Sequence, residues 1–106
     1  MEIVDRKNLL NDSENFSGAI VELGSGRAPE FTDSIKIDMI DDDLVDIVGD
    51  AIEVIKRIPT DSVASVYARH FIEHLEDPRG LLEEILRILR PGGIIVVVVP
   101  HFSNSF

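Results

Sequence analysis

The sequence predicts one α/β domain, built on a parallel β-sheet with helices on both of its faces. Short apolar segments bounded by turn residues alternate along the chain with helical segments or long crossovers, which is the pattern of a parallel sheet. Residues 94–99 form an unbroken run of six aliphatic residues, as expected of a strand buried on both faces. With 106 residues, 44% of them hydrophobic, the chain can bury a core without disulfides.

Five segments have the composition of strands. They are rich in β-branched or aliphatic residues, and the first of them runs into a Gly-Ser-Gly turn. In chain order they cover residues 18–24, 34–38, 44–48, 62–68 and 94–99. Residues 1–17 are polar and poorly periodic, so we assign them to an N-terminal extension of a domain that spans residues 18–106.

Two segments have the signals of helices. Residues 51–58 follow Asp50, whose side chain suits an N-cap, and end before a proline. Residues 78–90 follow Asp77 at a second N-cap position and begin with Pro78, which is favoured in the first turn of a helix. Apolar residues recur through this second segment at helical spacing, and the Pro-Gly-Gly after it ends the helix.

Composition excludes several classes of function. A net charge of −10, with no concentrated basic face, disfavours nucleic-acid binding. Residues 38–50 hold six Asp and no Lys or Arg, which is typical of a solvated loop. The absence of cysteine removes thiolate catalysis and cysteine-based metal sites, and it favours a reducing, cytoplasmic location. No apolar run approaches the roughly 20 residues of a membrane span, and no signal peptide is recognisable.

A ligand site is expected where the parallel strands end, because such sheets bind ligands at the carboxyl ends of their strands. Gly24-Ser25-Gly26 follows the first strand and lets a ligand approach the backbone, although a plain tight turn explains the same residues. Pro29 stands where a dinucleotide fingerprint has its third glycine, and Asp38 lies only 14 residues after Gly24. A nicotinamide or flavin site is therefore disfavoured.

The motifs, taken in order, resemble a known family. They are an acid-x-Gly-x-Gly at residues 22–26, Asp38 at the end of the second strand, Gly-Asp-Ala at 49–51, and the segment 70–100 from "HFIEHLEDP" to "PGGIIVVVVP". Over residues 18–105 the chain is similar to class I S-adenosylmethionine-dependent methyltransferases, in particular methyltransferase domains of type 11. The resemblance implies a Rossmann-like sheet with strand order 3-2-1-4-5 and S-adenosylmethionine as the cofactor.

The resemblance also implies roles around the methionine part of the donor. The backbone of Gly24, Ser25 and Gly26 would run along it, and Glu22 would organise its amino end. His70 would lie close by, in a binding role that is compatible with general-base chemistry. The resemblance assigns no catalytic residue.

Further roles are implied around the nucleoside. Asp38 would accept hydrogen bonds from both ribose hydroxyls, and Met39 would pack on adenine. Asp50 would accept from the adenine amino group, and the N–H of Ala51 would donate to a ring nitrogen. Each carboxylate has a structural alternative: Asp38 as a turn residue at a strand end, and Asp50 as a helix cap.

His70, Glu73 and His74 spell the inverted zinc-peptidase motif, His-x-x-Glu-His. That motif needs both histidines on one helical face, whereas His70 is expected at a strand end and the well-formed helix begins at Pro78. We therefore keep a zinc hydrolase as a minor alternative, predict no metal, and assign His74 a structural role.

Two features depart from the family pattern. Residues 27–33 leave room for at most a turn or two of helix between the first two strands. The family's sheet has seven strands, and this chain stops just after the fifth, as if truncated. We expect donor binding for methyl transfer to a small-molecule or protein acceptor, with a non-catalytic module that binds the donor or a partner as the alternative. We also expect self-association through the uncharged edge of the strand 94–99.

Overall fold

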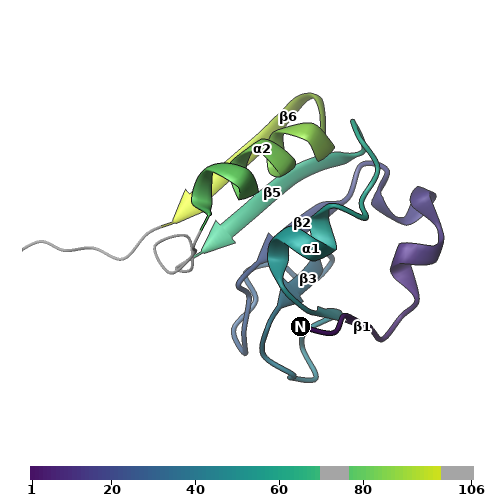
Figure 1. The fold of residues 1–106 in the computed structure, drawn as a ribbon, viewed down its shortest axis with the longest axis vertical. Coiled ribbons are helices and arrows are strands. Elements are labelled where there is room, and N and C mark those ends of the chain that lie inside the picture. Colours follow the sequence, from purple (N-terminus) through teal and green to yellow (C-terminus); the bar gives the residue numbers. More distant parts are fainter. Residues whose placement is uncertain (70–76, 99–106) are drawn as a thin grey trace, which may run out of the picture.

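The computed structural model describes residues 1–69 and 77–98, which form one six-stranded sheet in the order β1-β4-β3-β2-β5-β6 (Figure 1). The strands are β1 (Val4–Asp5), β2 (Ile20–Leu23), β3 (Ile35–Asp38), β4 (Ile47–Val48), β5 (Val63–Arg69) and β6 (Leu89–Val98). The helices are α1 (Ala51–Ile55) and α2 (Pro78–Ile88), with two short 3₁₀ turns, η1 (Leu9–Asn11) and η2 (Ser13–Phe16). No helix in this part of the chain is long and apolar enough to cross a membrane.

The predicted parallel sheet is confirmed, with β2 at its centre. β2 pairs with β3 on one side and with β5 on the other, both in parallel, and β4 and β6 extend the sheet outward. In order of the predicted strands this is 3-2-1-4-5, as the resemblance implies. β1 was not predicted: Val4 pairs with Val48 in an antiparallel ladder that adds residues of the N-terminal segment to the sheet edge.

The helix caps form as predicted, but the element boundaries differ. Asp50 accepts the N–H of Ile52 at 3.1 Å and caps α1, which ends at Ile55 rather than at residue 58. Asp77 accepts the N–H of Gly80 at 2.9 Å and caps α2. The prediction that the Pro-Gly-Gly ends this helix is wrong: α2 already ends at Ile88, where the backbone of Leu89 turns to an extended conformation, and the Pro-Gly-Gly lies within β6, near a register irregularity opposite β5.

Both helices pack on the same face of the sheet and against each other (Figure 1). Their buried side chains form one apolar cluster with the strands, including Val54, Ile55, Leu81, Ile85 and Ile88 from the helices and Val21, Leu23, Ile37, Ile47 and Val66 from the sheet. The expectation of helices on both faces is therefore wrong for the described residues. The opposite face carries the crossover between β2 and β3, which contains no helix.

Candidate functional site

The glycine-rich loop after β2 adopts a conformation that favours glycine. Gly24 and Gly26 have φ angles of +74° and +54°, in the left-handed region that other residues avoid. The N–H of Gly24 donates to the carbonyl of Ile37 at 3.0 Å, which closes the loop against β3. The loop is therefore more than a connection: it holds backbone groups at the carboxyl ends of β2 and β3.

Asp38, the last residue of β3, ties this loop to the neighbouring strand. Its Oδ2 accepts the N–H of Gly26 at 2.7 Å, and its Oδ1 accepts the N–H groups of Met39 at 2.6 Å and Ile40 at 3.2 Å. The half-buried carboxylate thus fills three of its roughly four acceptor positions with backbone donors. The turn-residue role of Asp38 is part of the structure.

A small cavity lies where β2, β3 and β4 end, and five of the predicted binding residues line it. The five are Gly24, Asp38, Met39, Asp50 and Ala51, and Ile37 and Gly49 complete the lining. Its volume is about 80 Å³, well below the roughly 300 Å³ at which small-molecule pockets begin. It can therefore enclose one part of a ligand, and the exposed Met39 side chain, with 59% of its surface accessible, stands at its border.

Asp50 combines its capping role with a free acceptor. Both backbone bonds that it receives, from Ile52 and Glu53, go to Oδ1. The described residues place no donor on Oδ2, so this oxygen of a cavity-lining carboxylate can accept a bond from a ligand.

Glu22 and Ser25 do not line this cavity. The Glu22 side chain is 1% exposed and accepts the N–H of Glu30 at 2.7 Å, the N–H of Phe31 at 3.3 Å and the hydroxyl of Ser34 at 2.5 Å. It anchors the crossover on the helix-free face. The Ser25 hydroxyl is buried and has no hydrogen-bond partner within residues 1–69 and 77–98.

Arg69, the last residue of β5, was missed by the sequence interpretation. Its guanidinium donates to the carbonyl oxygens of Ser25, at 3.2 Å, and Ala28, and it pairs with the Glu30 carboxylate at 3.4 Å. Its position at the carboxyl end of a strand next to β2 was the only available signal, because the contact joins residues 44 positions apart.

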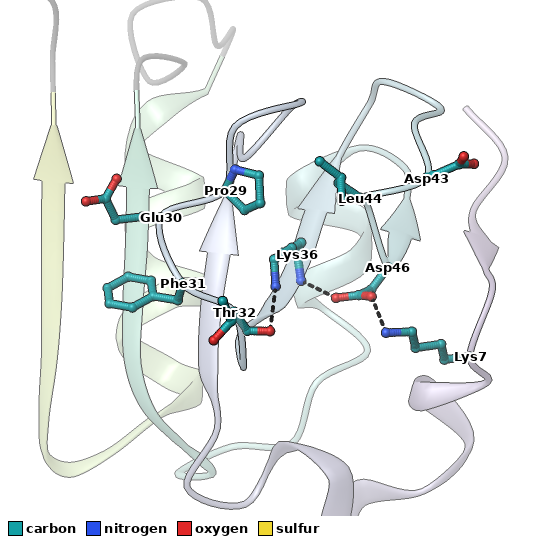
Figure 2. A pocket seen from close by; sticks show the side chains of 9 residues that line it. All are labelled: Lys7, Pro29, Glu30, Phe31, Thr32, Lys36, Asp43, Leu44 and Asp46. Atoms are coloured by element: carbon teal, nitrogen blue, oxygen red, sulfur yellow. Dashed lines mark hydrogen bonds and ion pairs between the residues drawn. The ribbon is translucent and has the colours of Figure 1, made fainter.

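A larger cavity of about 350 Å³ opens on the helix-free face between the crossover and β3 (Figure 2). Asp46 accepts the backbone N–H of Lys36 at 2.9 Å and pairs with the Lys7 ammonium at 2.8 Å. The Lys36 ammonium donates to the carbonyl of Ser34 at 3.0 Å. None of the predicted site residues lines this cavity.

His70, Glu73 and His74 lie outside the described residues, so the structure does not bear on the zinc motif or on a role for His70. Among the residues that are described, no three His, Cys, Asp or Glu side chains gather as metal ligands.

The residues at the strand ends fit part of an S-adenosyl ligand. Glycines leave the backbone open, Asp50 offers an unused carboxylate oxygen beside the small cavity, and Ser25 keeps an unpartnered hydroxyl in the adjoining loop. This combination of acceptors, backbone groups and an apolar Met39 wall suits a nucleoside with a polar tail.

Comparisons with known proteins identify the class. Residues 22–97 match the family model described as a methyltransferase domain, and the chain belongs to this family. Among solved structures it is similar to a chain in the complex between the Haloferax volcanii Trm112 methyltransferase activator and a protein described as a methyltransferase, with 26% identity and a TM-score of 0.54. The similarity covers 88% of this chain but 50% of that one, so the chain spans about half the length of its structural relative. No protein in the set of curated sequences matches it significantly.

Proposed function

We propose that the chain binds S-adenosylmethionine at the carboxyl ends of β2, β3 and β4 and holds it for methyl transfer. The observation that carries the proposal is the convergence of Gly24, Asp38 and Asp50 on one cavity in a chain of the methyltransferase domain family. These residues come from three separate strand ends, and each offers a group that a nucleoside can use.

In this proposal Asp38 receives the ribose hydroxyls, and Met39 packs on adenine. Three backbone N–H groups already occupy three of the roughly four acceptor positions of the Asp38 carboxylate. Two ribose hydroxyls must therefore compete with at least one of these N–H groups. The bond from Ile40, at 3.2 Å, is the longest of the three. Oδ2 of Asp50 accepts from the adenine amino group, and the N–H of Ala51 donates to the ring.

The loop residues Gly24, Ser25 and Gly26 carry the methionine part along their backbone. Glu22 acts on it indirectly, by holding the crossover that follows the loop. His70, which is not among the described residues, stays a predicted neighbour of the methionine part.

The bound donor would supply an activated methyl group on a sulfonium centre. The contribution of this chain is then to hold the donor so that an acceptor reaches the methyl carbon in line with the carbon–sulfur bond. We assign no catalytic base. The acceptor, a small molecule or a protein, is left open, and we place the reaction in the cytoplasm.

A second candidate is a non-catalytic module that binds the donor and acts through a partner protein. It is favoured by the structural relative, which comes from a complex with a methyltransferase activator and is about twice as long as the matched region. In this case the chain by itself would bind the donor but would not transfer its methyl group.

Calorimetric titration with S-adenosylmethionine and S-adenosylhomocysteine tests both candidates. Saturable binding of either ligand supports the site, and no binding by a folded chain refutes both. Methyl transfer to an acceptor separates the enzyme from the module. Asp43→Ala is a suitable control, because Asp43 is exposed and lies outside the small cavity.

A further inference from the structure

The crossover after the glycine-rich loop is held to the helix-free face by three side chains from two strands. Glu22 of β2 stands beside Tyr67 of β5 in the parallel register, and Arg69 lies two residues further along β5 on the same face. Glu22 and Tyr67 contact the middle of the crossover, whereas Arg69 also reaches its beginning, at Ser25 and Ala28.

The first two side chains hold the middle of the crossover. Glu22 accepts the N–H groups of Glu30 and Phe31. The Tyr67 ring meets the Phe31 ring edge to face, with centroids 5.4 Å apart and planes at 85°. Figure 2 shows the Glu30 and Phe31 side chains pointing toward β5, away from Lys36 and Asp46.

Arg69 differs from these two because it reaches the glycine-rich loop itself. Its guanidinium donates to the carbonyl of Ser25 at 3.2 Å, while Asp38 accepts the N–H of Gly26 at 2.7 Å. That carbonyl and that N–H belong to the same peptide group. One peptide plane is thus held at both ends, by a cation from β5 and an anion from β3.

Such a peptide needs two restraints. Gly26 has a φ of +54°, and a glycine at this point allows the plane to rotate at little steric cost. A ribose hydroxyl that bonds to Oδ2 of Asp38 would share this oxygen with the N–H of Gly26 and weaken the restraint on the N–H side. The bond from Arg69 to the Ser25 carbonyl would then contribute more of the restraint on the plane.

We infer that Arg69 is a positioning residue, which fixes the Ser25–Gly26 peptide in the orientation that the ligand meets. The expected effect of Arg69 on ligand binding rests on the proposed function, whereas its effect on the loop does not. The planar guanidinium can reach the carbonyls of Ser25 and Ala28 together, which the single ammonium of a lysine does less well.

The test compares Arg69→Met with Arg79→Met, a matched substitution at an exposed arginine of α2 that pairs only with Glu83 among the described residues. Amide hydrogen exchange of the ligand-free protein is measured at Gly26 and Ala28, with urea unfolding alongside. We expect Arg69→Met to speed exchange at these two amides about tenfold, as loss of a charged hydrogen bond would. Arg79→Met should leave both rates unchanged.

Binding of S-adenosylhomocysteine supplies the second readout. Arg69→Met should weaken it about tenfold relative to Arg79→Met, and Arg69→Lys should lie between the two. Glu30→Gln, which removes the exposed ion pair but leaves the carbonyl bonds, should have a smaller effect. If Arg69→Met does not fold, the exchange rates of Arg69→Lys decide the matter.

The two levels of failure are distinguishable. If the natural chain does not bind S-adenosylhomocysteine, the proposed function fails, while the exchange rates of the ligand-free protein still test the role of Arg69. Equal loop exchange in Arg69→Met and Arg79→Met would overturn the inference, whatever the affinities. A uniform rise in exchange over all strands would also overturn it, because it would indicate a general structural role.

Discussion

Replacing Asp38 with alanine is expected to lower both the stability of the protein and its affinity for S-adenosylhomocysteine. The substitution removes the acceptor of three backbone N–H groups, of which those of Met39 and Ile40 lie in exposed residues and can bond to water instead. The bond from Gly26, 2.7 Å long and part-buried, carries the main loss. A hydrogen bond to a charged group is worth about 1.5–3 kcal/mol, so we expect the free energy of unfolding to fall by about 2 kcal/mol.

The affinity should fall by about tenfold to a hundredfold, from the loss of charge-assisted bonds to ribose. Urea unfolding and calorimetric titration measure the two effects, with Asp43→Ala as the control that should change neither. An analogue of the ligand that lacks a ribose hydroxyl separates direct contact from loop ordering. If Asp38 touches the ribose, the natural chain distinguishes the analogue from the parent ligand, and Asp38→Ala does not.

Two results would refute this reasoning. An unchanged dissociation constant in a folded Asp38→Ala protein would remove Asp38 from the site. An unchanged free energy of unfolding would show that the bond to Gly26 does not hold the loop.

Three other expectations can be checked with simple measurements. Gly24→Val should abolish binding of S-adenosylhomocysteine and lower the free energy of unfolding by about 1–2 kcal/mol, because valine disfavours a φ of +74°. Normal binding of this variant in calorimetry would show that the loop is only a turn. The N–H of Leu44, and after it Arg27, hold the pKa of the Asp42 carboxyl below its usual value of 3.8. The stability that Asp42 contributes is therefore present above that pH and is lost as the pH falls through the lowered pKa. The urea midpoints of Asp42→Asn and of the natural chain should converge in acid. Val96 is 41% exposed on β6, whose outer edge pairs with no strand of the described residues. Light scattering should therefore show concentration-dependent association of the chain, and Val96→Lys should reduce it. A monodisperse monomer would contradict this expectation.

Local patterns determined the elements of the sheet and its caps. The apolar runs that became β2, β3, β5 and β6 were recognisable because each strand interior places aliphatic side chains in the core. Asp50 and Asp77 were recognisable as caps because capping is a bond to a backbone N–H two or three residues away. The two residues of β1 are too few to show any period, so this strand could not be predicted.

The candidate site also contains residues that local patterns predicted and residues that they did not. Gly24, Asp38 and Asp50 lie at strand ends or within two residues of them, where the rule that parallel sheets bind ligands at their carboxyl ends places a site, and the family resemblance supplied their predicted roles. Asp50 proved to be both cap and cavity residue, because the two backbone donors share one of its oxygens.

Only the tertiary structure decided how the rest of the loop is held. Both helices lie on one face, since their apolar sides complete a single cluster, and this leaves the β2–β3 crossover to cover part of the other face. Whether Glu22 meets the ligand or the crossover depends on which face of β2 it occupies relative to the helices. Arg69 reaches Ser25 because β5 pairs with β2 in a register that brings residues 44 positions apart to the same edge. Strand register is a property of the assembled sheet, and no local pattern around Arg69 encodes its contact with Ser25.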